Sequence, residues 1–308
     1  MGRGCVVSDL FQTLPNRRQF LQGGLALAAC LFRPPWLLAD QPAEERQSSE
    51  QPDCTRWALL SDTHIAADPR NRYRGFYPYQ NLQEVAGQIA CDLPDGLVIT
   101  GDLARLRGQT DAYENFKALL RPVAEQRPIH LGLGNHDNRD DFFRTFGGLD
   151  TGRRIVENRH VSTAVAGPVR LIVLDSLLTV NATPGKLGTE QRTWLELYLQ
   201  ACDETPTILF LHHTLMSDLL DTPRLFEIIR PLAKVKAVVY GHSHRYEYSQ
   251  IAGIHLINLP ATGYNFSSRQ PVGWVEARLT GTGGEFTLHA LDGNRRDNGQ
   301  VHRLLWRA

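Results

Sequence analysis

The chain lacks an excess of charge of either sign, because 33 basic and 33 acidic side chains cancel over 308 residues. A general nucleic-acid binder, or a protein held on anionic membranes, needs a basic excess to neutralise phosphates. We therefore expect no general nucleic-acid binding. With 42% hydrophobic residues, the chain can still form a sizeable core.

Cysteine is also scarce, with five in the whole chain. None of them lies in the polar motifs described below, which excludes a metal site built from thiolates. Cys54, Cys91 and Cys202 could form one disulfide in an oxidising compartment, and three free thiols fit the sequence equally well.

The apolar stretch 23–32 is too short to span a bilayer. Together with the preceding Arg17-Arg18, this stretch resembles a twin-arginine export signal, which would cover residues 1–39. The twin-arginine route is used by proteins that fold before export. The residues up to Cys30 also resemble a lipoprotein cleavage box that would make Cys30 a lipid anchor, and ordinary cleavage near residue 39 is the alternative. We therefore expect the export machinery as a partner and a periplasmic or membrane-tethered location outside the cytoplasm.

Residues 40–53 are polar and rich in Gln, Glu, Ser and Pro, which is typical of a disordered linker. Beyond them, short Val/Ile/Leu-rich runs alternate with helical patterns, which indicates one layered α/β domain over 54–308. Two hairpin-like pairs, near 161–174 and 273–288, indicate that some strands are antiparallel. The expected strands are 56–60, 96–100, 128–133, 169–174, 207–211, 235–240 and 255–259, and the expected helices are 79–93, 111–125, 140–146, 189–201 and 223–232.

Five polar motifs occur along the chain, nearly all of them directly after an apolar run. A four-residue word such as Gly-Asn-His-Asp arises by chance in about one chain in five hundred of this size, so the ordered set is not an accident of composition. The motifs are Asp62-Thr63-His64, Gly101-Asp102, Gly134-Asn135-His136-Asp137, Leu211-His212-His213 and Gly241-His242-Ser243-His244.

These motifs carry carboxylate, amide and imidazole groups, which together suit metal ions such as Mn, Fe, Co or Zn. Residues two apart in an extended segment point to the same side, so the first and the last motif could each present two ligands to one cavity. Seven ligands are too many for one tetrahedral ion but suit two ions that share a bridging carboxylate and a bridging water. The candidate ligands are Asp62, His64, Asp102, Asn135, His212, His242 and His244.

On these motifs the chain resembles the calcineurin-like metallophosphoesterases over about 57–264. Its compactness and the segment Leu259-Pro260-Ala261-Thr262-Gly263 after the last histidine pair resemble the small phosphodiesterase branch in particular. The resemblance implies an α/β fold, a four-layer α/β/β/α sandwich of two mixed sheets flanked by helices, with the metals at the carboxyl ends of the strands. It also implies two sets of ligands, with Asp102 bridging between them. The first ion would be held by Asp62, His64 and His244, and the second by Asn135, His212 and His242.

The resemblance further implies that a hydroxide bridging the two metals attacks the phosphoester. In that mechanism His136 stands beside the reacting phosphate and Asp137 orients it. The pair His212-His213 leaves open which imidazole enters the site, because Thr214 stands where the family usually has proline. We expect His212 as the ligand, with His213 as a supporting, substrate-side or structural residue. Arg105 occupies the position of the tyrosine ligand of purple acid phosphatases, which argues against that coloured centre.

The motifs predict a phosphoester substrate and do not specify what the phosphate is attached to. We expect a phosphodiester substrate, and a phosphomonoester or nucleotide is the alternative substrate. The alternative to an enzyme is a non-catalytic metal-binding interaction scaffold. The arginines and aromatics of the loop 68–80 could grip a second phosphate or stack on a base, or merely stabilise that loop. The candidate substrate residues are Arg72, Arg74, Tyr77, His213 and Asn265.

Overall fold

A computed structural model describes residues 53–147 and 155–308. The predicted export signal, its Cys30 and nearly all of the predicted linker lie outside these described residues. Within them, every helix is too short or too polar to cross a membrane.

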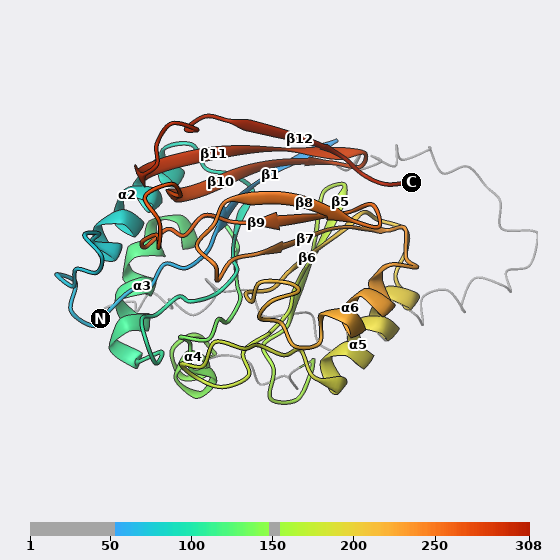
Figure 1. The fold of residues 1–308 in the computed structure, drawn as a ribbon, viewed down its shortest axis with the longest axis horizontal. Helices are drawn as coiled ribbons and strands as arrows, with labels where there is room; N and C mark the ends of the chain where they lie inside the picture. The colour runs from blue at the N-terminus through green and yellow to red at the C-terminus, as the bar shows by residue number, and fades with distance from the viewer. Residues whose placement is uncertain (1–52, 148–154) are drawn as a thin grey trace, which may run out of the picture.

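Twelve strands in the described part of the chain form two six-stranded mixed sheets (Figure 1). In the first sheet, β1, β2 and β3 are parallel, while β10, β11 and β12 extend the sheet in antiparallel fashion from β1. The order is β12-β11-β10-β1-β2-β3. The bounds are β1 Cys54–Leu60, β2 Gly96–Ile99, β3 Ile129–Leu131, β10 Pro271–Thr280, β11 Gly283–Gly293 and β12 Val301–Leu305.

In the second sheet, β5, β6, β7 and β9 are parallel, and an antiparallel strand closes each edge. The order is β4-β5-β6-β7-β9-β8. The bounds are β4 Ser162–Ala166, β5 Val169–Val173, β6 Thr207–Phe210, β7 Val235–Tyr240, β8 Glu247–Ile251 and β9 Ile254–Asn258.

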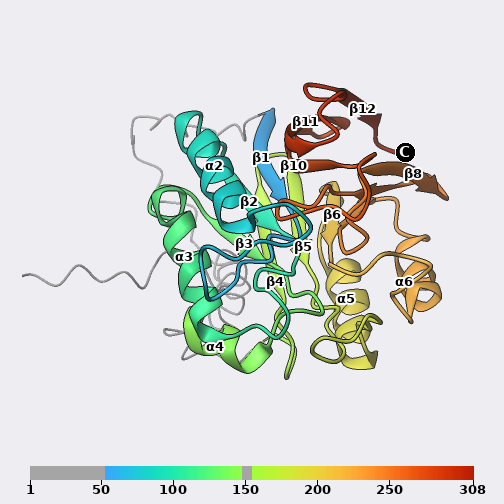
Figure 2. The same cartoon turned by 60° about the vertical axis from the view of Figure 1, so that its left-hand side comes forward.

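The sheets pack face to face, and helices cover both outer faces, with α2 to α4 on one side and α5 and α6 on the other (Figure 2). Strand β1 shows how this follows from alternation, because Trp57 and Leu59 pack between the sheets while Ala58 and Leu60 face the helices. The predicted four-layer sandwich is confirmed. The helices are α2 Pro78–Cys91, α3 Thr110–Ala124, α4 Arg139–Phe146, α5 Thr189–Ala201 and α6 Thr222–Ile229.

Local signals explain where several helices begin. The side chain of Asn138 accepts hydrogen bonds from the backbone N–H groups of Asp140 and Asp141, which caps α4. Helices α2 and α6 each carry proline in the first two positions, where no intrahelical N–H bond is lost.

The seven expected strands, five expected helices and two expected hairpins are present within a few residues of their predicted bounds. Two strands were not predicted, β8 and β12. Both lie at sheet edges and are largely exposed, so neither contains the buried apolar run that indicated the other strands.

Candidate metal centre

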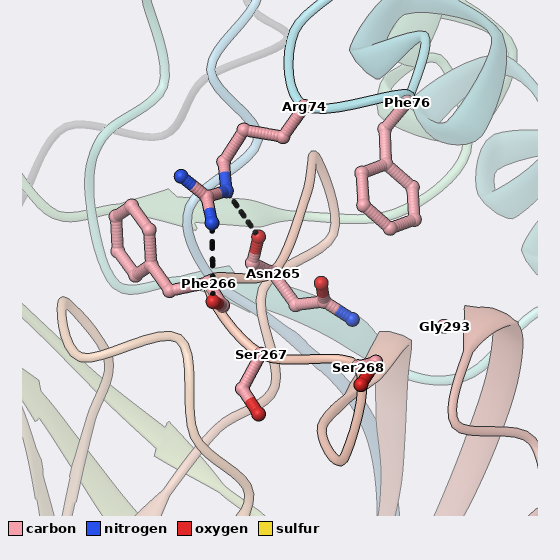
Figure 3. A pocket seen from close by; sticks show the side chains of 7 residues that line it. All are labelled: Arg74, Phe76, Asn265, Phe266, Ser267, Ser268 and Gly293. Atoms are coloured by element: carbon pink, nitrogen blue, oxygen red, sulfur yellow. Dashed lines mark hydrogen bonds between the residues drawn. The ribbon is translucent and has the colours of Figure 1, made fainter.

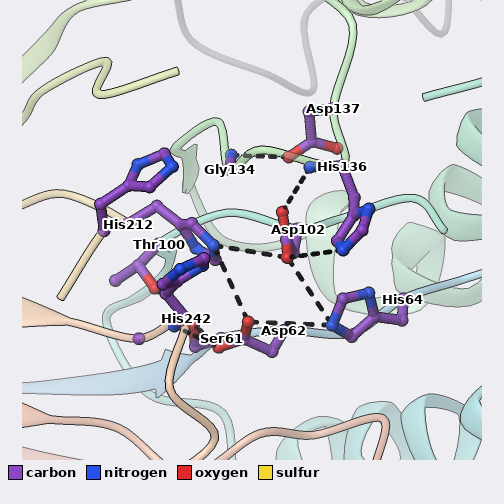
Figure 4. A network of polar contacts seen from close by, with 12 residues as sticks. Ser61, Asp62, His64, Thr100, Asp102, Gly134, His136, Asp137, His212 and His242 are labelled. Atoms are coloured by element: carbon purple, nitrogen blue, oxygen red, sulfur yellow. Dashed lines mark hydrogen bonds and ion pairs between the residues drawn. The ribbon is translucent and has the colours of Figure 1, made fainter. Parts of the chain in front are cut away.

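The five polar motifs meet at one end of the molecule because each follows a parallel strand. Motifs after β1, β2 and β3 come from the first sheet, and those after β6 and β7 come from the second. Parallel strands end at a common edge, and the two packed sheets bring their edges together. Figure 4 shows side chains from all five motifs around one polar network.

The first cluster consists of Asp62, His64 and His244. The Nε2 atoms of the two imidazoles are 3.1 Å apart. Asp62 Oδ1 lies 3.3 Å from Nε2 of His244 and 3.8 Å from Nε2 of His64. All three side chains are buried, so two ring nitrogens and a carboxylate oxygen face one small space.

The second cluster consists of Asp102, His212 and His242. Asp102 Oδ2 is 3.4 Å from Nε2 of His212, and the rings of His212 and His242 are 5.2 Å apart. The same Asp102 oxygen is 3.7 Å from Nε2 of His64, in the first cluster. Asp102 therefore lies between the two clusters, at the position that the resemblance gives to a bridging carboxylate.

Several buried polar atoms at this centre have no hydrogen-bond partner among the described residues. A buried polar atom without a partner costs about 1–3 kcal/mol, so a group of them needs an explanation. The atoms include Asp62 Oδ1, Asn135 Oδ1, His64 Nδ1 and both ring nitrogens of His212. A cation supplies an explanation for the two oxygens and for Nε2 of His212, because these atoms can act as electron-pair donors of the kinds that Mn, Fe, Co and Zn accept.

The paired ligands of the first and last motifs reach the centre through a backbone conformation different from the extended one that was predicted. Asp62 and His64 have φ values of 53° and 49°, and His242 and His244 have values of 69° and 52°. These residues are in the left-handed region, which is uncommon for residues other than glycine, and not in extended chain. Asp102 shares the conformation, with φ of 50°. Through these strained loops Asp62 and His64 enter one cluster, while His242 and His244 enter different neighbouring clusters, and such strain is concentrated at functional sites.

Two glycines of the motifs are required by close contacts with the carboxylates. A Cβ on Gly134 would lie 2.1 Å from Asp102 Oδ1. A Cβ on Gly241 would lie 1.9 Å from Ser61 Oγ and 2.5 Å from Asp62 Oδ2. Real Cβ atoms do not approach so closely, so the loops can hold the carboxylates in place only with glycine at these positions.

Charge reinforces the arrangement. Burial opposes ionisation of Asp62 and Asp102, yet neighbouring histidines outweigh it and hold the pKa of both carboxyls below the ordinary range. Burial also disfavours charge on His212, but Asp102 and Asp62 raise its pKa to about 9. Both carboxylates are therefore ionised at neutral pH, and the centre attracts positive charge.

His136 lies beside the clusters and, unlike the ligands of the first cluster, is partly exposed. Its Nε2 is 4.0 Å from Asp102 Oδ2, and the group His64, Asp102 and His136 is itself compact enough to surround an ion. Its Nδ1 is 3.1 Å from the carbonyl oxygen of Leu106. Because a carbonyl only accepts, Nδ1 carries the hydrogen, and Nε2 faces the centre.

The expected contact between Asp137 and His136 is wrong. The Asp137 carboxylate accepts backbone N–H bonds from Leu103, Ala104 and Gly134 and a bond from the Tyr113 hydroxyl. Burial, followed by the nearby charge of Asp102, raises the pKa of Asp137 to about 7 against the effect of those N–H bonds. Asp137 therefore fixes the loops after β2 and β3, and the Leu106 carbonyl orients His136.

Other residues that hold the candidate ligands in place could hardly be recognised from the sequence. Ser61 Oγ donates to Asp62 Oδ2 at 2.5 Å and accepts from Thr100 Oγ1 at 2.7 Å. Ser176 Oγ accepts backbone N–H bonds from His212 and His213. The contacts of Ser61 with Thr100 and of Ser176 with His212 and His213 join segments far apart in sequence, and serine and threonine are too common to indicate such a role from sequence.

The predicted substrate residues separate into three groups. Arg74 and Asn265 line a cavity of about 480 Å³ next to the centre (Figure 3). Arg72 instead lies over the ring of Tyr77, 5.5 Å from its centroid, within the loop 68–77. His213 is fully buried, with Nδ1 2.8 Å from Ser176 Oγ and its ring 4.9 Å from that of His242, so it packs against the second cluster and does not line the cavity.

The family model of calcineurin-like phosphoesterases matches residues 55–246, a span that contains all five motifs. The chain belongs to this family, and it is a metal-dependent phosphoester hydrolase by that membership and by its candidate metal clusters.

Two curated relatives illustrate the similarity. One is a 3′,5′-cyclic adenosine monophosphate phosphodiesterase from Pseudomonas aeruginosa, 28% identical over 68% of this chain and 76% of its own. The other, from Rhodococcus erythropolis, bears the name "Probable cyclic nucleotide phosphodiesterase" and is 30% identical over 76% of this chain and 79% of its own. Among solved structures, a dimetal phosphatase from Danio rerio has the same fold, with a TM-score of 0.64, 15% identity and coverage of 82% of this chain and 98% of that one.

Proposed function

We propose that the protein hydrolyses a phosphodiester, with one ion at Asp62, His64 and His244 and a second at Asn135, His212 and His242. The observation that supports this most directly is the position of Asp102, whose Oδ2 is within 3.7 Å of a candidate ligand in each cluster. The unpartnered buried atoms of both clusters fit ions of the Mn, Fe, Co or Zn kind. Ions bound there would activate a water molecule and neutralise charge on the phosphoryl oxygens.

The side chains of the protein would supply the remaining step, which is proton donation to the leaving oxygen. His136 is a polar group beside the clusters that is partly open to solvent, and its Nε2 faces them. With Nδ1–H donating to the Leu106 carbonyl, a second proton on Nε2 makes the ring a donor toward the leaving oxygen. Asp137 contributes indirectly, because it anchors the segment that carries Asn135 and His136.

Similarity to cyclic-nucleotide phosphodiesterases favours a diester over a monoester. The test is turnover of bis-p-nitrophenyl phosphate against p-nitrophenyl phosphate by protein loaded with Mn²⁺, after metal analysis. Faster turnover of the diester is expected. Faster turnover of the monoester would favour a phosphomonoesterase or nucleotidase, and absence of both metal and turnover would favour the interaction scaffold.

We also propose that the protein acts outside the cytoplasm, in the periplasm or tethered there through a lipid on Cys30. The support is the paired arginines before a short apolar stretch. Mass spectrometry of the N-terminal peptide of the exported protein distinguishes a lipid-modified Cys30 from cleavage near residue 39.

A further inference from the structure

The cavity beside the metal centre is built largely from aromatic and hydrogen-bonding groups. It has a volume of about 480 Å³, within the range of small-molecule sites. The rings of Phe76 and Phe266, the guanidinium of Arg74 and the amide of Asn265 line it (Figure 3). Two serines and Gly293 complete the lining, and none of these groups is acidic.

The cavity is separated from the first cluster by a single ring. Phe266 has 51% of its surface exposed, although it is a large apolar residue. Its ring centroid is 4.3 Å from that of His244, with the planes 31° apart. A ligand in contact with Phe266 would therefore lie next to a phosphate placed at the metal centre.

Arg74 is held in position by two of the five N–H donors of its guanidinium. Its Nε donates to the Asn265 carbonyl and its Nη2 to the Phe266 carbonyl, both at 3.2 Å. Its Cζ also lies over the Phe266 ring, 5.4 Å from the centroid. Within the described chain Nη1 has no partner, so a fixed cation with a free donor borders the cavity.

These groups match a nucleobase. Phenyl and guanidinium faces stack on planar heterocycles, and free N–H and O–H groups donate to ring nitrogens and carbonyl oxygens. A glycerol-like group would leave the two phenyl rings without a planar partner. We propose that this cavity binds the base of a nucleotide phosphodiester, which rests on the proposed phosphodiesterase function.

The test uses Phe76→Ala in the full chain, because Phe76 lines the cavity and is not one of the candidate metal ligands, whereas the ring of Phe266 packs on His244. Mn²⁺-loaded enzyme is assayed with 3′,5′-cyclic AMP and with glycerophosphoglycerol, a diester without a base. Loss of one stacking partner should lower kcat/KM for cyclic AMP roughly tenfold or more. Turnover of glycerophosphoglycerol should stay within about twofold. Leu197→Ala, an exposed position on α5, is the control and should change neither rate.

A binding measurement decides the proposal independently of turnover. Saturation-transfer NMR with cyclic AMP and metal-free protein should show the base protons H2 and H8 in contact with the wild type and not with Phe76→Ala. Equal losses on both substrates, no loss on either, or unchanged transfer to the base protons would each overturn the proposal. If the wild type hydrolyses no diester, the phosphodiesterase function fails, and the NMR result still decides what the cavity binds.

Discussion

At the scale of single residues, the function depends on a division of roles between ligands and a proton donor. Asp102 lies between the clusters, whereas His136 lies at their open side. Removing the Asp102 carboxylate should affect metal binding and catalysis together. Removing the His136 imidazole should affect catalysis alone.

His136→Ala should lower turnover about 10²- to 10⁴-fold, because a positioned proton donor contributes that much, while the metal content stays near that of the wild type. Asp102→Asn should lower metal content and activity together. Mass spectrometric metal analysis alongside the diester assay checks both variants. An unchanged rate of metal-replete His136→Ala would remove His136 from the mechanism.

His130 should make the stability of the fold depend on pH. Burial, helped by the charge of His160, lowers the pKa of His130 from 6.5 to about 4. Between these two pH values the unfolded chain binds a proton that the native protein does not, so the free energy of unfolding falls as the pH falls through this window. The loss amounts to up to roughly 3 kcal/mol and is absent above pH 6.5.

The measurement is urea denaturation of the wild type and of His130→Phe at pH 7 and at pH 4.5. Phe keeps a ring against Trp57, whose centroid is 5.8 Å from that of His130, but cannot be protonated. The variant should lose less stability than the wild type on acidification. Equal losses would mean that His130 makes no contribution to the acid sensitivity.

At the scale of elements, the site depends on how each parallel strand turns into its loop. Gly241→Ala, directly after β7, should cost about 1–3 kcal/mol and reduce metal content, because the new Cβ would collide with Ser61 and Asp62. Gly87→Ala, in the open interior of α2, should stabilise by about 0.5–1 kcal/mol. Thermal unfolding and metal analysis compare the pair. A Gly241→Ala protein that kept both its stability and its metal would contradict the close packing described here.

Sequence patterns predicted the buried strands well and the exposed edge strands poorly. Strand β5 is a continuous buried run and was evident, whereas β8 is mostly exposed and was missed. The motifs predicted which side chains meet, because each follows a strand end. They could not predict the left-handed backbone at Asp62 and His242, nor the bonds of Asp137, because these depend on contacts between loops far apart in sequence.

At the scale of the whole molecule, two sheets with helices on both outer faces leave one polar edge where both sets of parallel strands end. The cavity lined by Arg74, Phe76 and Phe266 lies at the same end of the molecule, since the ring of Phe266 contacts that of His244.

The N-terminal segment should determine where the molecule goes. Replacing both Arg17 and Arg18 by lysine should abolish export in a host with a twin-arginine pathway. The export machinery of that pathway recognises the arginine pair. Cell fractionation with immunoblotting checks this, and a wild-type chain in the same host is the control. Undiminished export of the double variant would contradict the proposed route.

The central claim, that two ions occupy this edge on either side of Asp102, is tested most directly by anomalous X-ray diffraction from crystals soaked in Mn²⁺. Two anomalous peaks are predicted, one among Asp62, His64 and His244 and one among Asn135, His212 and His242. A single peak, or peaks only at other places on the molecule, would contradict the account.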